Sequence, residues 1–447
     1  MASEDNRMSG RVRRYARVGT SVGGLAARMA GQRYLGMPGS SAKNAAELGR
    51  ALGGLKGPLM KVAQLLATIP DGLPDDYIEE LRALQSQAPA MGWSFVKRRM
   101  RSELGPDWQS RFESFEQEAA AAASLGQVHR ARGPGGRMLA CKLQYPDMAS
   151  TVEADLSQLK LVFALYKRHD PAIDTSEILR ELTARLREEL DYGREARHLR
   201  LFAEVLADEA GVHVPEVVPE LSTGRLLTMT WLDGAPLLDA KSAPQEARDE
   251  IARNMFAAWY SPLYRFGVLH GDPHLGNYTL RENGAVNLLD YGCVRILPSH
   301  FIQGVIDLYR AVRNNDRDLM MHAFESWGFI GLSAELAEVL SIWAKYIYGP
   351  LTDDRERLID ESGSGKFGGS VVAKTHAEIR RLGGVKPPRE FVLLDRSAIG
   401  LGSVFLHLQA KLNWHRAFEA LIAGFDSDAL DRRQGEILAR TGVPEAA

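Results

Sequence analysis

The chain has 447 residues, of which 45% are hydrophobic and 25% charged, and its formal net charge is -2. These values are ordinary for a globular protein, and a charge so close to zero excludes a global field that attracts nucleic acid. Cys141 and Cys293 are too few for a disulfide framework or a cysteine-rich zinc site, which indicates a reducing, cytoplasmic compartment. No run of 18 apolar residues and no secretory signal pattern are present.

Residues 1–40 form a basic arm with seven arginines and two acidic residues. Val18, Val22, Leu25 and Met29 follow one another at three- and four-residue steps, which is the spacing of an amphipathic helix. Such a helix would bind an anionic membrane surface peripherally. A flexible arm and a helix packed on the main domain are the alternatives, and the glycines of this segment disfavour any helix.

Residues 41–108 carry leucine and valine at helical spacing and predict a helical extension, broken by the turn signal at 70–72. Residues 109–234 predict a small β-rich lobe. Its clearest feature is the Gly-Pro-Gly-Gly turn at 133–136, followed by a strand at 137–144, which together predict a β-hairpin.

Dense charge at helical spacing predicts helix over 151–208, and β-branched and aromatic residues predict strands at 214–219 and 225–231. Residues 235–447 predict a helical lobe, interrupted by a strand-and-loop segment at 268–297. This order predicts an α+β, protein-kinase-like bilobal fold, with a small β-rich N-lobe, a helical C-lobe and a helical N-terminal extension.

Phosphoryl transfer needs a cation on the phosphates, metal ligands and a carboxylate near the attacking hydroxyl. Asp272 and Asn277 are spaced as the Asp and Asn of the kinase catalytic loop H-R-D-x-x-x-x-N. We expect Asp272 to accept the hydroxyl proton and Asn277 to bind magnesium. His270 holds the first position of the triplet, and Gly271 replaces its arginine.

An apolar segment leads to Asp290, in a position like that of the D-F-G motif, with Tyr291 in place of phenylalanine. Asp290 is the expected main magnesium ligand. Lys142 matches the V-A-I-K lysine that contacts the α- and β-phosphates. It needs a carboxylate partner on the following helix, for which Glu189 and Glu195 are the candidates.

No G-x-G-x-x-G segment precedes Lys142; alanines stand there instead. Alanine disfavours the positive φ angles that let a glycine loop wrap phosphates closely. We therefore expect the nucleotide to be held differently, by Ala121, Ala122 and Ala123 with help from Ser124 and Gln127.

The alanine-rich loop resembles that of the UbiB/AarF family of atypical kinase-like proteins, which includes the mitochondrial coenzyme Q biosynthesis ATPases. The likeness covers roughly residues 50–300, with a weaker match over 391–418. Five other segments are similar to that family: the K-x-G-Q-like 61–64, the stretch 73–81, the E-x-D motif at 189–191, the strand pair and hinge at 221–234, and the H-x-D-P-H-x-G-N motif at 270–277.

The resemblance implies that Lys61 and Gln64 lie over the active site, with Lys61 near Glu189 and Asp191, and that this extension blocks protein substrates. It implies that Glu195 pairs with Lys142. The other nucleotide-binding residues it implies, at the hinge, are Met229 and Trp231.

The implied cofactors are ATP or ADP with Mg²⁺. The implied activity is ATP hydrolysis or phosphorylation of a small or lipid-like substrate, in support of ubiquinone production. The implied partners are quinone-precursor lipids and other ubiquinone-biosynthesis proteins, and the chain acts as a monomer or a homodimer.

Ala63 stands where the family has glycine, and an alanine forced to positive φ is strained by about 1 kcal/mol. Two other functions stay open. A small-molecule phosphotransferase of the aminoglycoside or choline kinase type also uses H-G-D-x-H-x-x-N, but the alanine loop and residues 61–64 count against it. A nucleotide-sensing scaffold is the second, and the presence of Asp272 and Asp290 counts against it.

Overall fold

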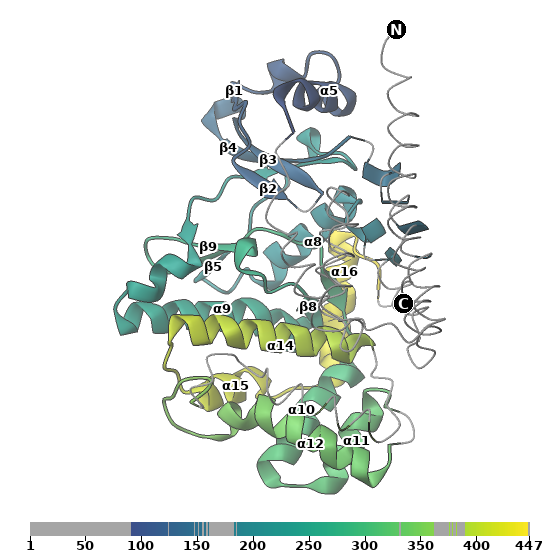
Figure 1. Cartoon of the computed structure of the whole chain (residues 1–447), viewed down its shortest axis with the longest axis vertical. Coiled ribbons are helices and arrows are strands. Elements are labelled where there is room, and N and C mark those ends of the chain that lie inside the picture. The colour runs from purple at the N-terminus through teal and green to yellow at the C-terminus, as the bar shows by residue number, and fades with distance from the viewer. Residues whose placement is uncertain are drawn as a thin grey trace, which may run out of the picture. The chain divides into compact units, whose positions relative to one another are not determined.

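The computed structural model describes residues 91–361 and 389–445, apart from 124, 147, 151, 154–155, 158–159, 161–182, 185 and 330–331, and also Thr375, Glu378 and Arg381 (Figure 1). The predicted basic arm and the segment 61–81 lie outside these residues. The chain is divided into two compact units. Unit 1 holds the described residues up to Asp191 with Thr223–Leu226, and unit 2 holds Tyr192–Ser222 with the residues from Leu227 onward.

The described part of unit 1 begins with a helix that packs beside an antiparallel sheet. Its elements among the described residues are α5 (Trp93–Leu104), η2 (Trp108–Arg111), β1 (Ser114–Phe115), β2 (Ala121–Ala123), β3 (Gly126–Arg132), η3 (Pro134–Gly136) and β4 (Met138–Gln144). β3 pairs with both β1 and β4, and β2 pairs with β3. The predicted hairpin is confirmed, because β3 and β4 are joined at Gly135 and Gly136, both of which have positive φ.

The core of unit 1 follows from helical spacing. Val96, Met100 and Leu104 recur every four residues, so they share one face of α5, and all three are buried. On the same helix Arg99 donates from Nε to the Gln144 carbonyl oxygen at 3.0 Å. This charged hydrogen bond fixes the end of β4, the strand that carries Lys142.

Unit 2 contains short strands around the predicted catalytic segments. They are β5 (Val212–His213), β6 (Leu226–Thr230), which starts in unit 1, β7 (Ala235–Pro236), β8 (Val268–His270), β9 (Tyr278–Leu280), β10 (Val286–Leu288) and β11 (Val294–Ile296). The order in one sheet is β5-β10-β9-β7, and β8 pairs with β11.

The strand predicted at 225–231 is confirmed as β6, whereas the strand predicted at 214–219 is wrong. There the strand is limited to Val212–His213, and Val217 forms only an isolated bridge with Met229. The physical reason is proline: Pro215 and Pro219 have no N–H to donate to a ladder, and Pro219 instead begins the 3-10 turn η4 (Pro219–Leu221).

The rest of unit 2, as far as the structure describes it, is mainly helical, which confirms the predicted helical lobe and, with the sheets, the α+β class. The helical elements are α8 (Tyr192–Val205), η5 (Leu237–Ser242), α9 (Gln245–Phe266), η6 (Leu275–Asn277), α10 (Ser299–Asn314), α11 (Arg317–Ser326), α12 (Ala334–Tyr348), η7 (Gly349–Thr352), α14 (Arg389–Leu408), α15 (Trp414–Ile422) and α16 (Ser427–Thr441).

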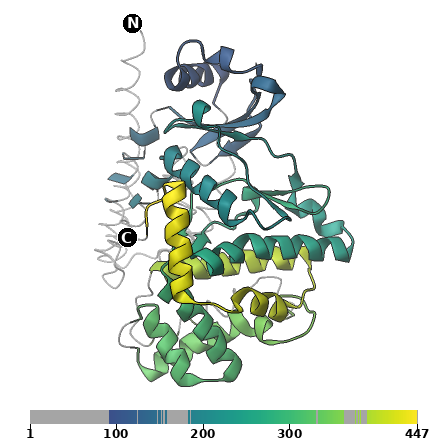
Figure 2. The same ribbon diagram turned by 180° about the vertical axis from the view of Figure 1, so that it is seen from behind.

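Two of these helices, α9 and α14, lie side by side in unit 2 (Figure 1). α16 contacts α8, α9 and α10, as the view from behind shows (Figure 2). Among the described residues, no helix combines the length and hydrophobicity needed to cross a bilayer. The helices therefore form a packed support for the strand-and-loop segment between α9 and α10.

Candidate active site

The first catalytic segment is positioned by the end of α9. Gly267, with φ of 65°, ends the helix in a left-handed turn, and its amide donates to the Leu263 carbonyl. β8 follows at once and pairs with β11, with His270 opposite Val294. This turn and strand place His270 and the loop after it beside the end of the second catalytic segment, which contains Asp290.

His270 joins the two segments. Its Nε2 lies 2.7 Å from the Asp290 carbonyl oxygen, and the Asp272 amide lies 3.3 Å from its Nδ1. Because a carbonyl only accepts and an amide N–H only donates, the ring is the neutral tautomer with the proton on Nε2. The ring is buried against Trp259 and Phe202, at centroid distances of 5.0 and 5.6 Å. His270, which the sequence identified only as the first residue of the motif, therefore links the two loops.

Asp272 and Asn277 face each other within the first segment. The Asn277 side-chain amide donates to the Asp272 carbonyl oxygen at 3.0 Å and to its carboxylate Oδ2 at 3.1 Å. The Leu289 amide donates to the Asn277 carbonyl oxygen at 2.8 Å, so Asn277 is also joined to the strand end before Asp290. Since the nitrogen of the Asn277 amide is used, its oxygen is the atom suited to a cation.

Asp290 lies in a tight turn. Its Oδ1 accepts from the Gly292 amide at 3.0 Å. Tyr291 is fully buried, donates its hydroxyl to the Leu288 carbonyl oxygen at 3.0 Å, and packs on Phe202. Burial raises the pKa of Tyr291 well above its usual value, so the hydroxyl stays protonated as that donor. The tyrosine thus takes the packing position of phenylalanine with its polar atom satisfied.

The donor set fits magnesium bound together with a nucleotide. Asn277 and Asp290 offer oxygen atoms, which Mg²⁺ prefers, and Mg²⁺ in kinases is completed by phosphates and water. Within the described part of the chain, no group of three or more His, Cys, Asp and Glu side chains is arranged to hold a metal by itself. Such a pair of ligands suits a metal that arrives with phosphate.

The glycine in place of the motif's arginine has a steric reason. The Gly271 amide donates to the Cys293 carbonyl oxygen at 2.7 Å. A β-carbon at position 271 would lie 2.8 Å from the Cys293 sulfur and 3.3 Å from that carbonyl oxygen. The two catalytic segments approach so closely here that a side chain at position 271 requires Cys293 to move.

Three contributors to the site carry no sequence motif. Ser397 of α14 is buried and donates its hydroxyl to the His270 carbonyl oxygen at 3.1 Å. Gly400, one turn further on, lies directly against the Pro273 ring. His198 of α8 lies 3.1 Å from the Tyr291 carbonyl oxygen through Nδ1. Burial, reinforced by Arg194, lowers the pKa of His198 to about 4, so the ring is neutral and donates from Nδ1.

Several of the residues predicted to bind the nucleotide lie in unit 1. Lys142 is nearly buried on β4, opposite Val128 on β3. Ala121–Ala123 form β2, and Ser124 lies outside the described residues. The Gln127 side chain is buried and bonded to both backbone polar groups of Met91 and to His129, so its amide is already used inside the unit.

The remaining predicted residues are divided between the units. Glu189 and Asp191 belong to unit 1 and are partly exposed and exposed, respectively. Glu195, in the first turn of α8, is buried in unit 2, so its pairing with Lys142 stays a prediction. Two further residues of unit 2 were predicted at the hinge: Met229, which is buried on β6, and Trp231, whose indole N–H donates to Asp233 at 2.8 Å.

The close approach of α14 to the first catalytic segment predicts the effect of one methyl group. Gly400→Ala places a β-carbon into the Pro273 ring, whereas Gly435→Ala in α16 meets no atom within 4 Å. We expect Gly400→Ala to lower the free energy of unfolding by about 1–3 kcal/mol, as overpacking does. Gly435→Ala should raise it by about 0.5–1 kcal/mol, as helix propensity predicts. Urea unfolding measures both, and equal stabilisation by the two variants would refute the contact.

The comparisons of the sequence with known proteins indicate similarity to atypical kinases. A family model described as the ABC1 atypical kinase-like domain matches residues 83–324. The mitochondrial atypical kinase COQ8 of Saccharomyces cerevisiae is 26% identical over 376 residues, which cover 83% of this chain and 74% of that protein. The mitochondrial atypical kinase COQ8B of Danio rerio is 28% identical over 404 residues, which cover 89% of this chain and 64% of that protein.

A solved structure is similar as well. Rv3197 of Mycobacterium tuberculosis, determined in complex with erythromycin, is 28% identical, with a TM-score of 0.61. The match covers 86% of this chain and 96% of that one. Together with the family match, it confirms the kinase-like fold predicted from the sequence.

Proposed function

This chain belongs to the ABC1 family of atypical kinase-like proteins, which agrees with the UbiB/AarF resemblance of its sequence, and from that premise we propose that it binds ATP with magnesium and transfers or hydrolyses the γ-phosphate. The observation that carries the proposal is the joining of two catalytic segments by His270. This one neutral ring bonds to Asp290 and Asp272, while Asn277 bonds to Asp272 and to the backbone before Asp290.

The side chains then have distinct tasks. Bound magnesium would neutralise phosphate charge, held by the Asp290 carboxylate and the Asn277 amide oxygen. The Asn277 amide nitrogen fixes the orientation of the Asp272 carboxylate by donating to Oδ2. Asp272 would accept the proton of an attacking hydroxyl or water at its carboxylate. His270 keeps both loops in register and, as a neutral ring bonded at both nitrogens, takes no part in proton transfer.

We propose a small or lipid-like substrate rather than a protein, and a role in support of ubiquinone production. The support is the resemblance of residues 61–64 and 270–277 to the UbiB/AarF motifs. Peripheral membrane contact through residues 1–40 and contact with quinone-precursor lipids belong to the same proposal. An ATPase assay with and without anionic liposomes and a quinone-precursor mimic tests it, and stimulation by both additions is expected.

The alternative of a soluble small-molecule phosphotransferase is tested in the same preparation. Choline, an aminoglycoside and erythromycin, the compound bound in the Rv3197 structure, are offered with MgATP. Rapid stoichiometric phosphorylation of any of them would replace the lipid-like substrate in our proposal. Unchanged ATP turnover in their presence, with stimulation by liposomes, would favour the proposed class.

Lys142 provides a direct test of the nucleotide site. Lys142→Ala removes the cation expected on the phosphates, and charged hydrogen bonds contribute roughly 1.5–3 kcal/mol, so ATP affinity should fall about 10- to 100-fold. Lys97→Ala, which removes an exposed lysine of α5 in the same unit, is the matched control and should leave affinity unchanged. Calorimetric titration with MgATP measures both. Equal affinities for the two variants would exclude Lys142 from the phosphate site.

A further inference from the structure

Unit 2 contains a second candidate site, a cavity of about 60 Å³ among its helices. It lies between α9, α10, α12, α14 and α15, and residues from the η7 loop close one side. Eight of the sixteen described residues that line it are aromatic. Six of these aromatic side chains are Tyr260 and Phe256 of α9, Trp343 of α12, Phe405 of α14, and Trp414 and Phe418 of α15.

Asp395 of α14 is the one ionisable acid or base, tyrosines aside, among the described residues that line this cavity. The Trp343 indole N–H donates to its Oδ1 at 2.8 Å. Burial raises the pKa of Asp395 to about 7, and the bond from Trp343 opposes that shift only in part. No ion pair joins this carboxyl to a described basic residue, and the proposed phosphoryl transfer does not use it.

The chemistry of the lining selects the kind of ligand. An anion would meet a carboxylate and the faces of aromatic rings, both of which repel it. A purely apolar molecule would leave the carboxyl without water and with one donor, whereas a carboxylate can accept several hydrogen bonds. An ammonium group supplies both donors and the opposite charge, and aromatic faces attract cations in desolvated sites.

The space limits the size of that ligand. A single water needs about 10–15 Å³ of such volume, so about 60 Å³ has room for only a few non-hydrogen atoms. The hydroxyl of Tyr348 donates to the Val305 carbonyl oxygen at 3.2 Å and does not compete for the ligand. We propose that the cavity binds a small primary alkylammonium ion, with its ammonium group on Asp395 and its short chain among the aromatic side chains.

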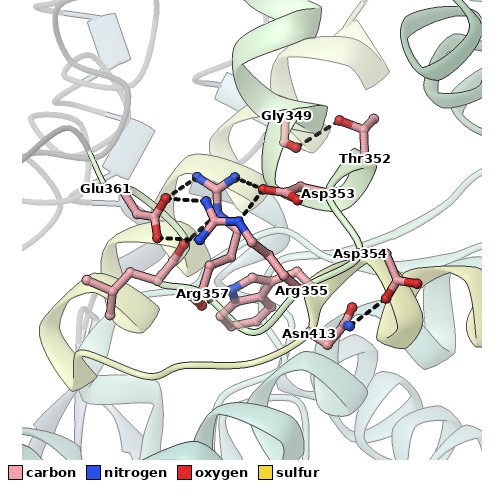
Figure 3. A network of polar contacts seen from close by, with 10 residues as sticks. Gly349, Thr352, Asp353, Asp354, Arg355, Arg357, Glu361 and Asn413 are labelled. Atoms are coloured by element: carbon pink, nitrogen blue, oxygen red, sulfur yellow. Dashed lines mark hydrogen bonds and ion pairs between the residues drawn. The ribbon is translucent and has the colours of Figure 1, made fainter.

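Among the described lining residues, those outside α-helices are Leu351 and Ile359, in the segment after α12. Surface ion pairs hold this segment: Arg355 and Arg357 both contact Asp353 and Glu361 (Figure 3). Arg357 is the half-buried member of this network, and the other three side chains lie nearer the surface.

The same segment is also joined to α15 and to the strand-like bridge before it. Asn413 bonds to Asp354 (Figure 3). Arg416 bonds to Asp354 as well, and Arg357 exchanges backbone hydrogen bonds with Leu412. Trp414, which lines the cavity, donates its indole N–H to the Arg357 carbonyl oxygen at 3.0 Å. The closing segment thus holds one aromatic wall of the cavity in place.

α14 connects this cavity to the active site. Asp395 faces the cavity, while Ser397 and Gly400, two and five residues later, contact His270 and Pro273 of the first catalytic segment. An alkylammonium ion on Asp395 would bind one face of the helix whose other face supports that segment. The cavity is therefore proposed as an effector site, distinct from the nucleotide site.

The test titrates n-propylammonium into the full-length protein at pH 8 without nucleotide and follows binding by calorimetry. Saturable binding at millimolar concentration or below is expected, with at least tenfold weaker binding of n-propanol, which has the same number of non-hydrogen atoms and no charge. Asp395→Asn should lose at least tenfold in affinity. Glu390→Gln, an acidic residue in the first turn of the same helix, is the matched control and should bind as the wild type does.

The pH dependence gives a second readout. Affinity should rise between pH 6 and pH 8, because only the ionised carboxylate attracts the cation. Burial raises the pKa values of Tyr260, Tyr264 and Tyr348, so these tyrosines stay neutral in this range. His415 lies behind the wall, with its Nδ1 against the Leu351 carbonyl oxygen. Asp395→Asn should abolish the pH dependence of binding, which assigns that dependence to Asp395.

A third variant protects the test against misfolding of Asp395→Asn. Ala398→Leu adds volume to the cavity wall without touching the carboxyl group, and it should also abolish binding. Equal affinity for n-propylammonium and n-propanol, or wild-type affinity in folded Asp395→Asn, would overturn the proposal, as would an absence of binding to the wild type. Because binding is measured without nucleotide, the result is readable even if the proposed phosphoryl transfer fails.

Discussion

Replacing Asp290 by asparagine is expected to lower magnesium-dependent ATP turnover by about 100-fold or more, because it removes the negative charge of the main predicted metal ligand. The fold should be kept. Oδ1 of Asp290 accepts from the Gly292 amide, and the asparagine side chain has an oxygen that can accept the same bond. The loss should therefore be one of metal and nucleotide binding and not one of folding.

Calorimetric titration of ATP with and without Mg²⁺ separates these effects. Asp290→Asn should bind free ATP about as the wild type does, with the magnesium-dependent gain removed. Asp428→Asn, at an exposed position in the first turn of α16, is the control and should change nothing. If Asp290→Asn bound MgATP with wild-type affinity, the metal would have to be held elsewhere.

Replacing Asp395 by asparagine should change the free energy of unfolding more favourably at alkaline pH than in acid. The difference between the two changes should reach up to about 4 kcal/mol. The pKa of Asp395 is raised from 3.8 to about 7 by burial. Between these values the folded state keeps a proton that the unfolded state releases, so wild-type stability falls as pH rises and is constant above pH 7. Each pKa unit corresponds to about 1.4 kcal/mol, and asparagine has no proton to lose.

Urea unfolding at pH 5 and pH 8 measures this difference, of which about 3 kcal/mol falls between the two conditions. The Trp343 indole N–H can donate to the asparagine oxygen as it does to Oδ1, so the substitution keeps that bond. Glu390→Gln serves again as the control on α14. A gain for Asp395→Asn that is the same at both pH values would show that the carboxyl is solvated and ionised throughout.

Local signals in the sequence were sufficient where the structure depends on neighbours in the chain. The hairpin of β3 and β4 follows from a glycine turn between two strand patterns, and the pairing register of its strands depends on no distant residue. The spacing of Asp272 and Asn277 likewise acts within one loop, where their side chains bond. The strand predicted at 214–219 was wrong because Pro215 and Pro219 have no N–H to donate to a ladder, whatever the β-branched residues between them favour.

The contributions of α14 could not be read from the sequence. Ser397, Gly400 and Asp395 lie more than a hundred residues after the catalytic segments, in a helix of mixed composition, and no motif distinguishes them. Their roles depend on which face of α14 meets His270 and which meets the cavity, and that is decided by tertiary packing. The same holds for His198, whose bond to Tyr291 joins residues 93 positions apart.

The contact between Gly271 and Cys293 also bears on how such an enzyme is controlled. Many protein kinases are switched on when a phosphate is added to the activation loop and arginine side chains bind it, which orders the site. Position 271 is where the arginine of the H-R-D triplet would stand, and the sulfur of Cys293 occupies the space beside it. A phosphate-triggered alignment cannot act through this position. The two segments are instead held together by their own backbone and by His270, so their alignment with each other comes with the folding of unit 2.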